Sequence, residues 1–434
     1  MPVRLVCAFT LLGMVTLIVA CSGSGTGPGS GDASGLFDSP EDCGSCHPQH
    51  LQEWQRSMHA YGATDPIMLR LREIAEEMGA GGVGEECIQC HGPSQARAEE
   101  MEDPGVDPQD LAEHGLSCDV CHSISEVPPV ADISFLADLD PTGAKYGRMT
   151  DPVPNEDHPS LHRSFFGSSA ICAPCHQVDL PDGVGLENTF REWQQTNLSG
   201  MGVECQTCHM KTYTGRAATD SPVREGIHRH TVVGVDYAYA PFQGIDLEAQ
   251  KADIQDLLEN AVSVSVEGIP AEAAPGEALD VVVRVTNDQT GHSIPSGVSF
   301  SREMWVSIAV TDSAGASVYR SGYLLANGDL VTVAEDPDLT LFHSKLYDAD
   351  GERTLLSFVA TSIDDSLLLP YMSTRTAHYP VTVPAAASGP LTVEIMLRFR
   401  PIAPPILRAI DLPELLPIEI FDMWSASYTV AVTG

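Results

Sequence analysis

The sequence has few cationic residues. Lys and Arg account for only 23 of 434 residues, four of them Lys, against 60 Asp and Glu, so the formal charge is −37. Because proteins bind nucleic acids through clustered Lys and Arg, this shortage argues against a nucleic-acid partner. The charge favours solubility and partners that are basic or cationic. The hydrophobic share of 43% is ordinary for a globular protein, so the chain is not a disordered acidic tail.

Common catalytic signatures are also missing. The sequence has no Gly-rich phosphate-binding loop, and residues 261–434 contain neither cysteine nor a Gly-x-Ser-x-Gly nucleophile motif. Nothing in this pattern therefore points to nucleotide or acyl-transfer chemistry. The length of 434 residues predicts two or three domains.

Most of the cysteines fall into one repeated pattern. Ten of the 12 belong to five Cys-x-x-Cys-His motifs, the attachment signature of c-type haem. In such motifs the two thiols bond to the haem vinyl groups and the histidine becomes the proximal iron ligand. Zinc knuckles are the alternative, but zinc sites do not require His after every second Cys. The five motifs are Cys43/Cys46/His47, Cys87/Cys90/His91, Cys118/Cys121/His122, Cys172/Cys175/His176 and Cys205/Cys208/His209.

The N-terminus has the features of an export signal. Residues 1–20 combine Arg4 with an apolar run, too short and wrongly flanked for a membrane span. The stretch Ile18–Cys21 resembles a bacterial lipobox, which predicts cleavage before Cys21 and acylation of its thiol; the alternative is an ordinary signal peptide with an incidental Cys21. Without Cys7 and Cys21, ten of the 12 cysteines remain for five haems and none for a disulfide.

These signals predict an exported bacterial lipoprotein on the periplasmic side of the outer membrane or on the cell surface. Residues 21–36 form a Gly/Ser linker, expected to act as a flexible tether from the lipid. The membrane is therefore an expected partner through an N-terminal lipid anchor, and the sequence is compatible with an oligomer or a filament.

Two unlike domains are expected after the linker. Residues 37–245 contain short helical pieces, among them 48–59 and 67–78, and five haems would form their core. Residues 246–260 have apolar side chains at helical spacing and predict a connecting helix. From 261 to 434 the apolar period changes to two, which predicts an all-β immunoglobulin-like sandwich. The expected fold is thus multidomain, a haem-packed, mostly α and irregular domain followed by an all-β sandwich.

The spacing of the motifs and a weak repeat add detail. The first cysteines are 44, 31, 54 and 33 residues apart, which suggests that haems two and three, and four and five, form local pairs. The segment 53–60 (EWQRSMHA) resembles 192–199 (EWQQTNLS), but Leu198 stands where the first copy has His59. Because Leu cannot bind iron, a ligand in one copy does not transfer to the other.

Ten histidines outside the motifs are candidates for the sixth ligands, enough to saturate all five irons. His59 is the best candidate, on a helix after the first motif. His230 is preferred over His228, and His162 slightly over His158. His114, four residues before Cys118, is balanced between a ligand and a solvated loop histidine. A Met ligand, which would raise the reduction potential, stays open for individual haems.

His292 is the most informative of these candidates. It lies in TGHSIPSG between two predicted strands, where Gly291, Pro295 and Gly297 specify a tight loop. A rigid loop of this kind can present an imidazole to a metal, which would attach the β domain to the haem domain through iron. The alternative is a loop histidine bonded to backbone. The remaining histidines are expected to be structural or superficial: His50, His343 and His378.

The ordered set of motifs resembles the multihaem c-type cytochrome superfamily, which includes tetrahaem electron carriers of ammonia oxidation, hydroxylamine oxidoreductases and pentahaem nitrite reductases. The resemblance covers residues 43–234, and the GHSIPSG loop resembles β domains attached to some multihaem cytochromes. It implies a haem-packed fold, mostly bis-His irons and electron transfer. The catalytic haem of the nitrite reductases has a proximal Lys in Cys-x-x-Cys-Lys, whereas all five motifs here end in His, which argues against nitrite reduction. The matching elements are CGSCHPQHLQEWQRSMHA, ECIQCHGP, GLSCDVCH, ICAPCHQV, EWQQTNLSGMGVECQTCHMK and HRHTVVG.

The leading functional hypothesis is an electron-transfer lipoprotein with five covalently attached haems c, working between a redox donor and a redox acceptor protein. The alternative is an oxidoreductase in which one haem lacks a distal ligand and acts on a small nitrogen or sulfur species. A third hypothesis, compatible with the first, makes the β domain a docking or adhesion module.

Overall fold

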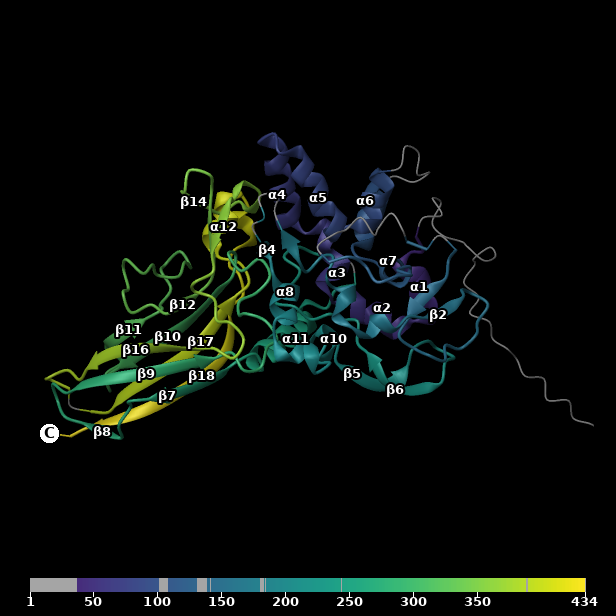
Figure 1. Cartoon of the computed structure of the whole chain (residues 1–434). Coiled ribbons are helices and arrows are strands. Elements are labelled where there is room, and N and C mark those ends of the chain that lie inside the picture. Colours follow the sequence, from purple (N-terminus) through teal and green to yellow (C-terminus); the bar gives the residue numbers. More distant parts are fainter. Residues whose placement is uncertain are drawn as a thin grey trace, which may run out of the picture.

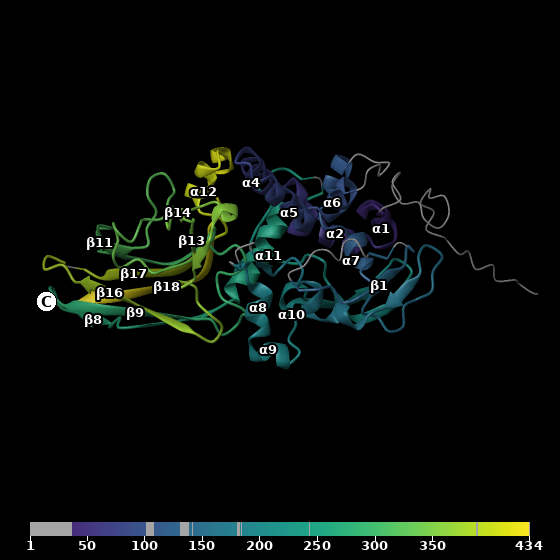
Figure 2. The ribbon, with the colours of Figure 1, turned by 45° about the horizontal axis from the view of Figure 1, so that its top comes forward.

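The fold is described from a computed structural model that covers residues 37–100, 108–130, 139–140, 142–179, 183, 185–242, 244–387 and 389–433. The predicted signal peptide, Cys7, Cys21 and the linker lie outside these residues. Across the described ranges, no helix has both the length and the apolar character needed to cross a membrane. A helix-rich part and a strand-rich part lie side by side, and the C-terminus is at the far end of the strand-rich part (Figure 1, Figure 2).

The helix-rich part consists of short helices. Four of them (α1, α2, α4 and α6) begin at a proline, whose fixed φ and missing N–H suit the first helical position. Side chains of Ser39 and Asp65 cap α1 and α4 by accepting backbone N–H groups. The helices are α1 (Pro40–Cys46), α2 (Pro48–Trp54), α3 (Met58–Tyr61), α4 (Pro66–Glu77), α5 (Gly81–His91), α6 (Pro93–Glu99), α7 (Cys118–His122), α8 (Thr189–Gln194), α9 (Asn197–Gly200) and α10 (Cys205–His209).

Short strands and 3-10 turns join these helices. The strands form three two-stranded sheets, one parallel and two antiparallel. The 3-10 turns used below are η1 (Gly62–Thr64), η2 (Pro108–His114) and η5 (Ser169–Ile171). The paired strands are β1 (Lys145–Gly147) with β2 (Ser160–His162), β3 (Val178–Asp179) with β4 (Gly185–Glu187), and β5 (Thr212–Arg216) with β6 (Val223–His228).

The helix predicted over residues 48–59 is interrupted. It ends at Trp54 and resumes at Met58, and between them the Ser57 hydroxyl donates to the Trp54 carbonyl at 2.8 Å. A serine side chain that bonds to a nearby carbonyl competes with the helical backbone pattern, which accounts for the break. The helix predicted over 67–78 is present as α4.

The sequence repeat corresponds to a structural repeat. The Trp54 indole donates to the Leu116 carbonyl at 2.9 Å, and the Trp193 indole donates to the Val203 carbonyl, also at 2.9 Å. Each accepting residue lies two positions before the first cysteine of a motif. Each tryptophan therefore holds the N-terminal flank of one attachment helix, α7 in the first copy and α10 in the second.

The structural repeat extends to His59 and Leu198, the position at which the two copies differ in metal-binding ability. The Leu116 N–H donates to the His59 carbonyl at 2.8 Å, and the Val203 N–H donates to the Leu198 carbonyl at 3.1 Å. His59 and Leu198 are thus equivalent in backbone position although only one can bind a metal. In the second copy, the Leu198 side chain instead lies against Gly291 of the strand-rich part.

The two parts differ in their hydrophobic cores. The largest cluster of buried apolar side chains lies in the strand-rich part, where β9 (Ala278–Thr286), β10 (Glu303–Thr311), β16 (Thr374–Thr382) and β17 (Leu391–Arg400) all contribute. Among the described residues of the helix-rich part, the clusters are small, such as Ala63, Met68, Ile88 and Ala96. The described side chains alone give the helix-rich part little interior.

The strand-rich part contains two main sheets that share this core. One has the order β11-β10-β17-β18-β8, with β12 also paired to β10, and the other has the order β16-β9-β7. Burial alternates along β16 and most of β17, as expected for strands with one face in the core. The other strands are β7 (Ser263–Glu267), β8 (Glu272–Ala273), β11 (Ser317–Ser321), β12 (Leu341–Phe342), β13 (Lys345–Tyr347), β14 (Arg353–Thr354), β15 (Ser362–Asp364) and β18 (Phe421–Val432).

Two helices connect the parts. Helix α11 (Leu247–Glu259) places Ile254 and Leu258 in the large core. Helix α12 (Pro404–Ala409) belongs to a second apolar cluster that also includes Ile67 and Leu71 of α4. The two parts are therefore packed against each other through apolar side chains.

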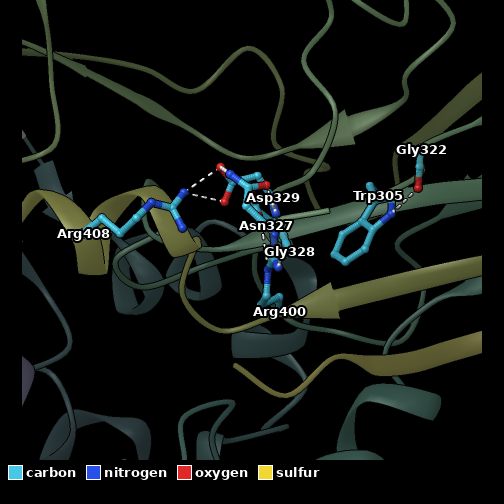
Figure 3. A network of polar contacts seen from close by, with 8 residues as sticks. Trp305, Gly322, Asn327, Gly328, Asp329, Arg400 and Arg408 are labelled. Carbon is cyan, nitrogen blue, oxygen red and sulfur yellow. Dashed lines mark hydrogen bonds and ion pairs between the residues drawn. The ribbon is translucent and has the colours of Figure 1, made fainter. Parts of the chain in front are cut away.

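Polar contacts fix α12 to the strand-rich part (Figure 3). The Arg408 guanidinium contacts both carboxylate oxygens of Asp329, at 2.5 and 2.6 Å. In the same region Arg400 donates to the Gly328 carbonyl at 2.7 Å. Both contacts come from the Nη2 nitrogen, and hydrogen bonds between charged groups are stronger than neutral ones, so they help to hold α12 on the strand-rich part.

Candidate haem sites

The five motifs present their side chains in a common way. Four lie on helices α1, α5, α7 and α10, which end at or just before the histidine of the motif, and the Cys172–His176 motif follows η5. In a helical turn, residues i, i+3 and i+4 lie on one face. Two thiols and one imidazole therefore face the same side, which is the arrangement that covalent haem attachment requires. All ten cysteines are free.

Thiols of different motifs lie next to each other. The Cys43 thiol is hydrogen-bonded to Cys118, and this contact together with burial raises the pKa of Cys43. The motifs thus adjoin as first with third, second with fourth, and fourth with fifth. The spacing along the chain suggested the pairs second with third and fourth with fifth. The fourth and fifth motifs do adjoin, whereas the second adjoins the fourth, since sequence distance only limits how far apart two motifs can be. The other contacts are Cys90 with Cys175 and Cys172 with Cys205.

Four of the five motif histidines face a second imidazole. Two imidazoles on opposite sides of one metal, each at about 2.0 Å through nitrogen, have ring centres about 6 Å apart. The observed separations fit this spacing, and the rings are inclined by 21 to 39°. The pairs are His47–His158 at 6.4 Å, His122–His230 at 6.2 Å, His176–His59 at 6.3 Å and His209–His292 at 6.4 Å.

The Nδ1 atoms of three motif histidines contact backbone carbonyls. His47 contacts Ala217 O, His122 contacts Tyr146 O, and the third pair is His209 with Val233 O, each at 2.6 Å. An Nδ1–H held in this way fixes the tautomer and leaves Nε2 free for a metal. His176 differs, because its Nδ1 contacts the Glu187 carboxylate at 2.9 Å.

The opposing histidines are held similarly. His230 Nδ1 contacts the His228 carbonyl at 3.1 Å, and His292 Nδ1 contacts the carbonyl of Ser293 at 2.8 Å. Burial lowers the pKa of His59 and of His230 to about 3. These rings are neutral at physiological pH, and neutral imidazole is the form that binds metals.

Glu187 changes the proton affinity of His176. Burial alone would lower the pKa of His176, but the charge of Glu187 and the hydrogen bond to it raise the pKa to about 9. Burial disfavours the charged form of Glu187, yet its interaction with His176 holds the pKa of this carboxyl below its usual value. The carboxylate therefore keeps a proton on Nδ1 of the ring.

The second motif has no such partner. All 15 histidines lie within the described residues, and none stacks against His91 at the separation seen in the four pairs. His114, at the end of η2, has a buried Nδ1 with no hydrogen-bond partner. Turn η2 contacts η1, and Gly62 of η1 lies against the His91 backbone. His114, which the sequence left balanced between a ligand and a solvated loop histidine, thus lies near the second motif without facing the His91 imidazole.

The structure places His158 where the sequence favoured His162. His158 faces His47, whereas the side chain of His162 is exposed at the end of β2. The choice between the two histidines depends on the parallel pairing of β1 with β2, which aligns Lys145 with Ser160. This pairing fixes the position of the chain on both sides of Ser160. No local feature of the sequence distinguishes the two histidines.

Several other histidines have alternative contacts. His50 lies 6.1 Å from His47, but its Nε2 contacts the Tyr213 hydroxyl at 3.3 Å and its ring lies beside that of His230. His378 is exposed and contacts Asp280 at 3.1 Å. The sequence did not indicate that the His50 ring lies beside His230. The two come together only because the fold brings β5 close to α2.

The loop that contains His292 is fixed to α8. Glu192 accepts hydrogen bonds from the Ser293 N–H at 2.9 Å and the Ser296 hydroxyl at 3.1 Å. A side chain at Gly291 would lie 3.1 Å from the Trp193 ring, so the loop approaches the helix as closely as a glycine permits. These contacts hold the His292 ring opposite His209 from across the boundary between the two parts.

Comparisons with known proteins give matches to cytochromes in both sequence and fold. Residues 42–123, which include three motifs, match the family of cytochrome c554 and c-prime. The structure is similar to the crystal structure of a penta-heme cytochrome c552 from Thermochromatium tepidum, with a TM-score of 0.62, 19% sequence identity, and coverage of 91% of this chain and 99% of that chain. No curated protein matches the chain.

Two other solved structures resemble the chain only weakly. The CARDB domain of a Pyrococcus furiosus protein, in complex with di-metal ions, has a TM-score of 0.18 and 12% identity over 40% of this chain and 87% of that chain. A sporulation control protein from Bacillus subtilis has a TM-score of 0.16 and 10% identity over 40% and 50%. Neither bears on function. The family match falls on three of the motifs, and the fold is shared with nearly the whole of a penta-heme cytochrome, which confirms the resemblance to the multihaem c-type cytochromes.

Proposed function

We propose that this cytochrome binds five haems c and transfers electrons through them, with four of the irons held between two histidines. The observation that supports this most directly is the set of four imidazole pairs at 6.2 to 6.4 Å. With both axial positions occupied by protein, an iron exchanges electrons rather than substrates.

The proposed attachment follows the motifs. The thiols of each motif would bond to one haem, and the proximal ligands would be His47, His91, His122, His176 and His209. The distal ligands of four haems would be His158, His230, His59 and His292, for the first, third, fourth and fifth haem respectively. The bound haems would supply reversible one-electron Fe(III)/Fe(II) chemistry, and the chain would tune it through ligands, burial and hydrogen bonds.

Contacts among the motifs support a continuous path. The thiol neighbours connect the first haem to the third, the second to the fourth and the fourth to the fifth. The remaining gap is narrow, because Cys121 is close enough to Cys172 and Cys175 to raise the pKa of both thiols. All five haems would then adjoin, with the fourth in contact with the second, third and fifth.

Haem content and ligation test this proposal together. The intact protein, produced in a host that attaches haem c, should have the mass of the chain plus five haems. Its oxidised electron paramagnetic resonance spectrum should show at least four low-spin irons. Fewer haems, or several high-spin irons, would contradict the electron-transfer proposal.

A second function is favoured by His91. Because no imidazole faces it at the paired separation, the second haem is the one that would have an open iron, and the protein would then act on a small nitrogen or sulfur species. Adding cyanide or nitrite to the oxidised protein distinguishes the two. A high-spin signal that disappears when cyanide or nitrite is added supports the catalytic function. If instead the second haem is low-spin in the unaltered protein and becomes high-spin in His114→Ala, His114 is its ligand.

We also propose the cellular setting. Cleavage before Cys21 and acylation of its thiol would anchor the protein on the periplasmic side of the outer membrane or at the cell surface, where it would exchange electrons with redox protein partners. Labelling with a radioactive fatty acid tests the anchor, since Cys21→Ser should abolish the label.

The strand-rich part would form an immunoglobulin-like sandwich that docks a redox protein partner.

A further inference from the structure

The acceptor of the His176 Nδ1 atom distinguishes the fourth haem site. Three other motif histidines contact neutral backbone carbonyls at 2.6 Å, whereas His176 contacts the Glu187 carboxylate at 2.9 Å. A carboxylate withdraws the Nδ1 proton more strongly than a carbonyl does, so the ring becomes a more basic metal ligand.

The chain fixes this carboxylate to its imidazole. Glu187 ends β4 and lies opposite Val178 of β3 in the antiparallel pair. The segment after it is tied back to the motif, since the Phe190 N–H donates to the His176 carbonyl at 3.0 Å and the Arg191 N–H donates to the Gln177 side chain at 3.0 Å. The contact is therefore held by the pairing of β3 with β4 and by these two hydrogen bonds.

The charge of Glu187 is not neutralised by another side chain. Within the described part of the chain, its only ion-pair partner is His176, and its side chain is 19% accessible. The nearby Arg302 is already engaged by Asp236, with 2.6 Å between Nη2 and Oδ2. A partly buried negative charge next to the ligand favours the ferric iron, which carries one more positive charge than the ferrous iron.

We infer that Glu187 is a positioning residue that makes the fourth haem the lowest-potential haem of the four bis-His haems. This inference rests on the proposed ligation of that haem by His176 and His59. Because the fourth haem adjoins the second, third and fifth, electrons would rest on the haems at either side and cross this central haem one at a time. The couple is Fe(III) plus one electron to Fe(II), with the Nδ1 proton retained.

The test is a redox titration of the intact haem-loaded protein and its E187Q variant. Glutamine keeps an oxygen that accepts from Nδ1 but removes the charge. We expect the midpoint of one haem to rise by at least about 59 mV, a tenfold change in its one-electron reduction equilibrium, while the other four change far less. No change, or an equal rise for all haems, would overturn the inference.

D179N is the matched control. Asp179 lies on the same hairpin, pairs with Arg191 at 2.5 Å, and is not in contact with a motif histidine. The substitution makes the same change in net charge as E187Q. Because Asp179 does not contact an iron ligand, we expect the midpoints of all haems to stay unchanged in D179N. A rise in the same single midpoint as in E187Q would show that general charge, and not the hydrogen-bonded carboxylate, sets the potential.

A measurement on the unaltered protein covers the case in which E187Q does not fold. His59→Ala removes the proposed distal ligand of the fourth haem, so the low-spin signal lost in that variant identifies this haem. In the unaltered protein that signal should be the last of the four to disappear during reduction. If it disappears earlier, the role of Glu187 is refuted although the four low-spin irons, and with them the proposed function, remain.

Discussion

The imidazole rings of His209 and His292 lie 6.4 Å apart and are inclined by 21°, although one belongs to an attachment helix and the other to a loop between two strands. In a haem-loaded protein this pair would join the helix-rich and strand-rich parts through one iron. The strand-rich part would then have a direct effect on the spin state and potential of the fifth haem.

Replacing His292 tests this link. In His292→Ala we expect the iron bound by His209 to lose its distal ligand and become high-spin, with no change at the other haems. Electron paramagnetic resonance measures the result. His378→Ala is the control, because that histidine is exposed on β16 and should leave all spin states unchanged. A fully low-spin His292→Ala protein would exclude His292 as a ligand.

The neighbouring histidines His158 and His162 allow a matched comparison. His158→Ala should convert the first haem to a high-spin state that binds cyanide, since His158 is the ring that faces His47. His162→Ala should keep the spectrum of the unaltered protein. The reverse outcome would show that the exposed histidine moves to the iron and that the pairing seen here is wrong.

The tryptophans of the repeat should contribute to stability in similar amounts. Trp54→Phe removes the donor to the Leu116 carbonyl, and Trp193→Phe removes the equivalent donor to Val203. Leaving a partly buried carbonyl without its donor costs about 1–3 kcal/mol. Calorimetry should therefore show a lower unfolding temperature for each variant. An unchanged temperature in both would mean that water replaces the indole without cost.

A pH effect should arise from His343 in the strand-rich part. Burial, followed by the charges of Arg353 and Lys345, lowers its pKa to about 4. The unfolded chain binds the proton near pH 6.5, so between pH 6.5 and 4 unfolding is favoured as the pH falls, by roughly 3 kcal/mol in total for a group that is 7% exposed. Above pH 6.5 His343 is neutral in both the folded and the unfolded state, so this loss of stability is absent there.

His343→Gln should reduce that pH dependence. Calorimetric scans between pH 4 and pH 7 on both proteins measure it, and the unfolding temperature of the variant should change less over this range. If the two curves stay parallel, protonation of His343 does not contribute, and another buried group accounts for the loss of stability in acid.

Much of the chemistry could be predicted from local sequence. The Cys-x-x-Cys-His motifs specify which thiols and which histidine share a helical turn, so the haem-binding character follows without knowledge of the fold. The apolar alternation likewise predicts β9, β10 and β17. These signals are local, because each depends on residues within one turn or one strand.

The remaining features depend on contacts between distant segments. The choice of His158 over His162 follows from the pairing of β1 with β2, and the thiol neighbours follow from the folding of separate motifs onto each other. The sequence does not indicate β16 clearly, because proline is unfavourable within a strand; Pro380 is tolerated there since it faces outward and β16 is at the edge of its sheet. Within the region of two-residue apolar period, residues 353–361 form a strand only to Thr354, and a 3-10 turn follows.

The most direct test of the account is a crystal structure of the haem-loaded protein that shows the axial ligands of each iron. We expect four irons to be held by His47 with His158, His122 with His230, His176 with His59, and His209 with His292. A water molecule, a methionine or a different histidine at the sixth position of any of these four irons would contradict it.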